Sequence, residues 1–168
     1  GCLVRDEDRW VPHGDPMEVA IDVLARRIGL DRDVDRAEHP EQARYPFDAR
    51  RRRMSVVVDG EVLVKGAPDA VLPRCRTGGG APAALDELAA RGLRVLAVAR
   101  RDMSEPLPEG PETVEVDLEL LGLLAFEDPP RHGVGEAVAA CRRAGIRLAM
   151  ITGDHPQTAL AIAREVGF

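Results

Sequence analysis

Aromatic residues and cysteines are scarce in this chain of 168 residues. Aromatics make up 3% of the sequence against 45% hydrophobic residues in total, so a core must be built from Ala, Val, Leu and Ile. The hydrophobic share is large enough for such a core and excludes a disordered chain. Cys2, Cys75 and Cys141 show no CxxC spacing, which excludes a disulfide framework or a zinc site and indicates free thiols in a reducing compartment.

Long hydrophobic runs are also missing. The longest, around residues 120–126, is far shorter than the about 20 residues that span a bilayer. The N-terminus has no signal-peptide pattern, and it starts at Gly1 without an initiator Met, so we expect a piece of a longer protein. Lys65 is the single lysine among 23 basic residues, and its compact ammonium suits contacts that a planar guanidinium does not make.

Helical periodicity and turn residues predict an alternation of helices and strands. The first helix, residues 15–28, has Asp15 as N-cap and stops at Gly29. A hairpin is predicted at 54–65, with a two-residue turn that begins at Asp59. The other elements expected are helices at 68–74, 82–91, 134–144 and from 156, strands at 93–100, 113–126 and 146–151, and a loop or short irregular helix at 31–44.

A double proline, Pro129 and Pro130, divides the chain where its composition changes from acidic to nearly neutral. The helix–strand–helix order after it, following a strand, is typical of a parallel α/β unit. We therefore expect an α/β protein of two parts. Residues 1–127 form an α+β domain with an antiparallel sheet flanked by helices, and residues 128–168 form a fragment of a Rossmann-like parallel domain.

Residues 47–56 place Phe47 and four arginines directly before the hairpin. One interpretation is a solvated charge run, and another is a nucleic-acid patch, since clustered arginine neutralises phosphates. A third is a nucleotide pocket, in which Phe47 stacks on a base and arginines meet phosphate oxygens. The net charge of −6 and the few aromatics argue against nucleic acid, and the other two interpretations stay open.

Lys65 and Gly66 lie between an expected strand and Pro68, which starts a helix. A glycine there lets a ligand approach the backbone, and a helix N-terminus favours anions, but an ordinary strand-to-helix turn also contains such residues. Glu18 has the spacing of a capping box, and helix capping explains it whether or not it touches a ligand.

Thr152, Gly153 and Asp154 follow an expected apolar strand and precede a helix. Ligands of α/β sheets bind at this edge, where a hydroxyl and free backbone N–H groups can hold a phosphoryl oxygen. A capped turn with Asp154 as N-cap is the alternative. The four histidines have no metal-ligand spacing and are expected at the surface, and no Ser/His/Asp or Cys/His arrangement is found.

Six segments, taken in order, resemble the cytoplasmic part of P-type cation-transporting ATPases, close to the type II, calcium-pump-like group. Their counterparts in the family are GDPTE, FDSxRKRMSV, KGAPE, RVLA, DPPR and MITGD, and they lie here at residues 14–18, 47–56, 65–69, 94–97, 128–131 and 150–154. The resemblance covers nearly the whole chain. It identifies residues 1–127 as a nucleotide-binding domain, and residues 128–168 as a hinge with part of a phosphorylation domain that resembles the haloacid dehalogenase (HAD) fold.

The resemblance implies a set of cofactor-binding residues, with ATP and its Mg²⁺ as the cofactors. Glu18 and Phe47 would contact the adenine, Lys65 would line the base and ribose side, and Arg94 would reach toward the phosphates. The full set is Glu18, Phe47, Arg52, Lys65, Gly66, Arg94, Thr152, Gly153 and Asp154, the last three near the transferred phosphoryl group. Met17, Ala49, Arg52 and Asp69 depart from the residues usual in the family.

Segments corresponding to the family's DKTGT and GDGxND are missing from the sequence, so catalytic and metal-ligating residues are expected outside it. The parent would be an ion-translocating ATP hydrolase, whereas this part is expected to bind ATP or ADP and to hydrolyse none. Its partners would be the remaining phosphorylation, actuator and transmembrane domains, which make it the cytoplasmic portion of a protein of the bacterial plasma membrane, with no nucleic-acid partner.

Two alternatives are kept. One is a fragment of a HAD-like phosphatase, which would need a paired-aspartate nucleophile motif. The other is a non-enzymatic interaction module that binds nucleic acid or acidic lipid through Arg50, Arg51, Arg52 and Arg53.

Overall fold

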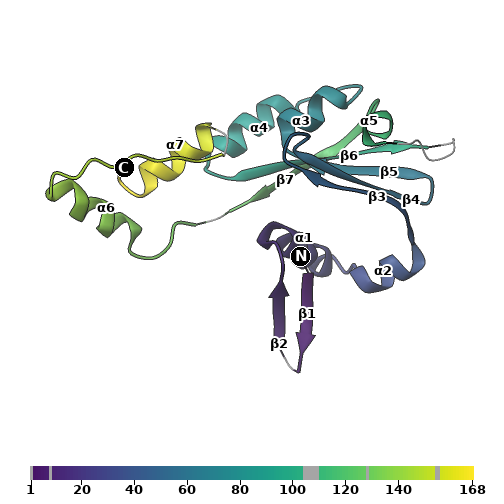
Figure 1. Ribbon diagram of the computed structural model, residues 1–168, viewed down its shortest axis with the longest axis horizontal. Helices are drawn as coiled ribbons and strands as arrows, with labels where there is room; N and C mark the ends of the chain where they lie inside the picture. Colours follow the sequence, from purple (N-terminus) through teal and green to yellow (C-terminus); the bar gives the residue numbers. More distant parts are fainter. Residues whose placement is uncertain (1, 8, 104–109, 128, 154–155) are drawn as a thin grey trace.

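A five-stranded antiparallel sheet forms the centre of the protein in a computed structural model, which describes residues 2–7, 9–103, 110–127, 129–153 and 156–168. The strands follow one another in the sheet as they do in the sequence (Figure 1). They are β3 (Glu41–Asp48), β4 (Arg53–Val58), β5 (Glu61–Gly66), β6 (Arg94–Asp102) and β7 (Glu119–Phe126). The expected antiparallel sheet of the first domain is thereby confirmed.

One face of this sheet carries the hydrophobic core. Short helices cover it (Figure 1): α3 (Pro68–Val71), the 3-10 turn η1 (Leu72–Arg74), α4 (Ala81–Ala90) and α5 (Pro111–Val114). Buried and half-buried residues alternate along β4 and β5, as expected for strands with one buried face. The core consists of Val57, Val62, Val64, Val71, Ala97, Ala99, Val114 and Leu118. These are the small aliphatic residues that the composition predicts.

The opposite face of the sheet looks toward an N-terminal unit (Figure 1). It consists of α1 (Pro16–Arg27), α2 (Arg32–Glu38) and a hairpin of β1 (Cys2–Asp6) and β2 (Arg9–His13). The predicted N-cap is confirmed, because Asp15 Oδ1 accepts hydrogen bonds from the backbone N–H groups of Met17 at 2.9 Å and Glu18 at 3.2 Å. Buried Asp22 of α1 joins the hairpin by accepting a 2.7 Å hydrogen bond from the Leu3 N–H.

The C-terminal part carries two helices, α6 (Val134–Arg143) and α7 (Pro156–Glu165). Helix α7 packs against α4, and Thr158 Oγ1 donates a 3.1 Å hydrogen bond to the Leu93 carbonyl. The strand expected at 146–151 is not formed, and Ile151 is 97% exposed. A strand needs a neighbour for its backbone hydrogen bonds, and no described strand of this chain pairs with these residues.

Three other boundaries differ from the sequence-based expectation. The stretch 31–44, expected as a loop or a short irregular helix, forms the short helix α2 and the first half of β3. The polar residues and Pro46 of β3 are compatible with a strand because β3 lies at the edge of the sheet, where proline is tolerated. The long strand expected from 113 is shorter, since α5 takes residues up to Val114 and β7 begins at Glu119. The hairpin of β1 and β2 was not predicted. No helix in the described ranges has the length and apolar character needed to cross a bilayer.

Candidate functional site

The strand register brings several of the predicted binding residues to one end of the sheet. Asp48 of β3 pairs with Arg53 of β4, Arg53 pairs with Gly66 of β5, and Gly66 pairs with Ala97 of β6. These four paired residues form a row across the sheet, and Phe47 and Lys65 are each one residue away from it along their strands. Arg94 begins β6 and lies beyond the row on the side where β3 and β5 end.

Glu18 and Lys65 form an ion pair between α1 and β5. Lys65 Nζ donates to both carboxylate oxygens of Glu18, at 2.5 and 2.6 Å, and the two side chains are 23% and 35% exposed for Lys65 and Glu18. The carboxylate of Glu18 therefore faces the sheet, while Asp15 supplies the helix cap. The pair joins two residues predicted to contact one ligand, and it leaves both accessible to that ligand.

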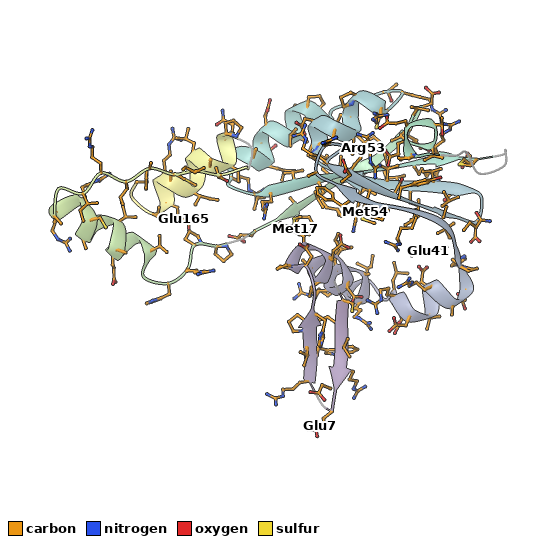
Figure 2. All side chains as sticks on the ribbon, in the orientation of Figure 1. Glu7, Met17, Glu41, Arg53, Met54 and Glu165 are labelled. Atoms are coloured by element: carbon orange, nitrogen blue, oxygen red, sulfur yellow. The ribbon has the colours of Figure 1, made fainter. Side chains whose placement is uncertain are left out.

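Met17 of α1 and Met54 of β4 are both labelled in Figure 2 where α1 faces the sheet. Met54 pairs with Lys65 in the β4–β5 ladder and is half-buried on the face away from the core. Figure 2 also shows that the neighbouring Arg53 points to the opposite face. The open face beside Lys65 thus offers apolar and polarisable surface, of the kind that a flat aromatic ligand requires.

Arg52 and Gly66 come together through the backbone. The Ala67 N–H donates to the Arg52 carbonyl at 2.9 Å, and the Arg52 guanidinium lies 2.6 Å from the Asp69 carboxylate. A Cβ on Gly66 would lie 2.6 Å from the Arg52 carbonyl oxygen and would also meet Arg53. The glycine is thus required by the close approach of two chain segments, whether or not a ligand is present.

The remaining predicted residues differ in their surroundings. Phe47 is 64% exposed, and its ring is available for stacking at the end of β3. Arg94 is exposed at the start of β6. Thr152 and Gly153 are exposed in the segment between α6 and α7, outside the sheet that carries the other residues. Asp154 lies outside the described residues.

A buried polar cluster beneath the turn between β3 and β4 was not predicted. The Glu115 carboxylate is completely buried and accepts hydrogen bonds from Arg51 Nη1 at 2.5 Å, Arg53 Nε at 2.6 Å and Ser55 Oγ at 2.8 Å. Its partners precede it by 60 to 64 residues, so no local spacing could have revealed it. The one available signal was Ser55, a polar residue on the buried face of a predicted strand, which needs a hydrogen-bond partner there.

The arginine run is largely neutralised within the chain. Arg51 and Arg53 pair with Glu115, and Arg52 pairs with Asp69. The backbone N–H groups of Arg51 and Arg50 hold the pKa of Asp48 below its usual value, so that carboxylate stays charged inside the turn. The run is therefore less basic than its sequence indicates.

Within the described part of the chain, no group of three or more His, Cys, Asp or Glu side chains is arranged to hold a metal ion.

Comparisons with known proteins match this chain to two family models. Residues 3–81 match the cytoplasmic domain N of P-type ATPases, and residues 56–168 match the haloacid dehalogenase-like hydrolases. The chain is similar to a sodium/potassium exporting P-type ATPase of Schizosaccharomyces pombe, with 39% identity over 94% of the chain and 17% of that protein. It is also similar to a probable cation-transporting ATPase F of Mycobacterium tuberculosis, with 40% identity over 99% of the chain and 20% of that protein.

A third relative is a calcium-transporting ATPase of Bacillus subtilis, with 35% identity over 98% of the chain and 21% of that protein. The chain spans about a fifth of the length of these curated relatives. The two matches overlap at residues 56–81. This chain belongs to the P-type cation-transporting ATPases, with sequence from the N domain and from the HAD-like part.

Proposed function

We propose that residues 1–127 bind ATP and present its γ-phosphate to an aspartate outside this chain, in a parent protein that couples phosphorylation to cation transport. Residues 128–168 are the hinge and part of the phosphorylation domain in this proposal. The observation that carries it is the Glu18–Lys65 pair, with both carboxylate oxygens on one ammonium beside the open face of the sheet.

The pair suits a purine nucleotide for chemical reasons. A carboxylate accepts hydrogen bonds from an exocyclic amine, an ammonium donates to ring nitrogens and ribose hydroxyls, and a partly exposed aromatic ring stacks on the base. Glu18, Lys65 and Phe47 supply these three groups from α1, β5 and β3. In this proposal Arg94, exposed at the same end of the sheet, contacts the phosphates.

The internal pairing of the arginine run favours this proposal over a polyanion-binding module. Arg51 and Arg53 bond to one buried carboxylate. Breaking either pair costs free energy, because it leaves a buried charge without its partner. A polyanion would meet fewer free guanidinium groups than the sequence contains, whereas a nucleotide needs only one or two.

The affinity of this part alone is expected to be modest. Base, ribose and one phosphate contact correspond to a dissociation constant near millimolar, or about −4 kcal/mol. Thr152 and Gly153 would add contacts near the transferred phosphoryl group only when the domains close in the parent.

The test is an ATP titration followed by amide chemical shifts, run beside GTP. Saturable shifts at Glu18, Phe47 and Lys65, smaller with GTP, are expected. Lys65→Ala removes the ammonium and should weaken ATP binding by about tenfold or more, since a hydrogen bond from a charged group contributes roughly 1.5–3 kcal/mol. Arg143→Ala on exposed α6 removes one positive charge elsewhere and should leave the affinity unchanged.

Shifts confined to residues 50–53, equal for ATP and GTP and abolished by salt, would contradict the nucleotide site and indicate an anion patch.

A further inference from the structure

Glu115 directly follows α5 and sits completely buried beneath the turn that connects β3 to β4. Burying an ionised carboxylate is unfavourable unless charges and hydrogen bonds compensate it. Two guanidinium groups and one hydroxyl do so here, all donated by residues of the turn or of β4: Arg51, Arg53 and Ser55. The cluster therefore ties this turn to a helix more than 60 residues later.

Arg51 connects the buried carboxylate to the end of β3. Its Nη1 bonds to Glu115, and its Nη2 donates a 2.7 Å hydrogen bond to the Pro46 carbonyl, directly before Phe47. Arg53 Nη1 donates a 3.0 Å bond to the Arg51 carbonyl. One buried carboxylate thus holds the arginine on each side of Arg52 and, through Arg51, the backbone that leads into Phe47.

The turn itself has a conformation that needs support. Asp48 Oδ1 accepts from the N–H groups of Arg50 and Arg51, each at 2.9 Å. Arg52 follows with φ = 52°, in the left-handed region that a non-glycine residue seldom adopts. Phe47 is 64% exposed, so packing against the core does not fix its ring. The orientation of both residues depends on what anchors the turn.

We infer that Glu115 is a positioning residue for nucleotide binding: from the core face of the sheet, it holds the β3–β4 turn so that Phe47 and Arg52 face the ligand. This inference rests on the proposed function and adds a residue that does not itself touch the nucleotide. Without the anchor the turn samples other conformations. The apparent affinity then falls in proportion to the population of the binding-competent one.

The experiment compares Glu115→Gln and Arg51→Lys with the control Val114→Ala, measuring ATP affinity by calorimetry and amide hydrogen exchange at 48–52 without nucleotide. Glu115→Gln keeps the side-chain shape and removes the charge. Arg51→Lys keeps the charge and loses the fork that joins Glu115 to Pro46. Val114 is the fully buried neighbour of Glu115 in the hydrophobic core, so Val114→Ala destabilises the same helix without touching the polar cluster.

Both test variants should weaken ATP binding by about three- to tenfold, if the competent turn falls to between a third and a tenth of the population. Exchange at 48–52 should accelerate in both, because the open population of the turn rises. Val114→Ala should lower the melting temperature and leave both quantities unchanged at temperatures where it is folded. A double variant, Glu115→Gln with Phe47→Ala, should bind ATP at most about twofold more weakly than Phe47→Ala alone. The reason is that Glu115 acts largely through Phe47.

Unchanged affinity and exchange in Glu115→Gln, or changes equal to those of Val114→Ala, would overturn the inference. If Glu115→Gln does not fold, Arg51→Lys decides the question, since Glu115 keeps Arg53 and Ser55 in that variant. If the unsubstituted protein does not bind ATP, the proposed function fails, while the exchange comparison still shows whether Glu115 holds the turn.

Discussion

Gly66 allows a decisive test, because the need for glycine at this position has two explanations: close packing against the protein's own backbone, or the close approach of a ligand. A Cβ at this position would lie 2.6 Å from the Arg52 carbonyl oxygen and 2.7 Å from Arg53 Cα, and would overlap Arg53 Cβ. Two of these atoms belong to the backbone, which cannot rotate away as a side chain can. Gly66→Ala must therefore push β5 and the β3–β4 turn apart.

Overpacking a core position usually costs about 1–3 kcal/mol. We expect the upper end, about 3 kcal/mol, because backbone atoms must shift. In a chain of this length, each kcal/mol lost from the free energy of unfolding lowers the melting temperature by about 2–4 °C, so the expected decrease is about 6–12 °C. Thermal unfolding followed by circular dichroism, with a urea titration at 25 °C, measures both quantities.

Gly78→Ala is the matched control. A Cβ on Gly78 has no neighbour within 4 Å, so the same methyl group there should leave stability unchanged or raise it by up to about 1 kcal/mol through the unfolded chain. The steric reasoning is refuted if Gly66→Ala is as stable as Gly78→Ala. If ATP binding alone is lost in such a stable variant, the glycine serves the ligand.

Two further predictions follow from the N-terminal unit. Asp15→Ala removes the cap of α1 and should lower the free energy of unfolding by about 1 kcal/mol in a urea titration, whereas an unchanged value would mean that α1 contributes little to cooperative unfolding. His39 Nδ1 lies 2.5 Å from Asp59 Oδ2, and this hydrogen bond raises the pKa of His39. Since the folded-state pKa is the higher one, the pair should stabilise the protein below the ordinary histidine pKa and lose this effect as pH rises through the raised value. NMR titration of Asp59→Asn should show the His39 midpoint fall toward about 6.5, and an unmoved midpoint would contradict the pairing.

The sequence predicted the features that depend on neighbouring residues. The cap at Asp15, the hairpin turn at Asp59 and Gly60 and the core of small aliphatic residues all follow from local chemistry, and all are confirmed. The order of six short motifs identified the family for the same reason, because each motif is a contiguous segment. The N-terminal hairpin and the edge strand β3 escaped prediction, since edge strands tolerate polar residues and proline that local patterns assign to loops.

Features that depend on distant residues appeared only in the folded chain. The sequence placed Glu18 and Lys65 in one predicted site, but their direct ion pair depends on how α1 docks beside β5. The expected strand at 146–151 has the right residues and no described partner strand, so its local pattern does not suffice. Glu115 lies in a stretch that the sequence assigned to a strand, and its role follows only from the three donors it meets. Local hydrogen bonds and hydrophobic periodicity are encoded in short segments, whereas a buried charge is tolerated only where folding brings its partners.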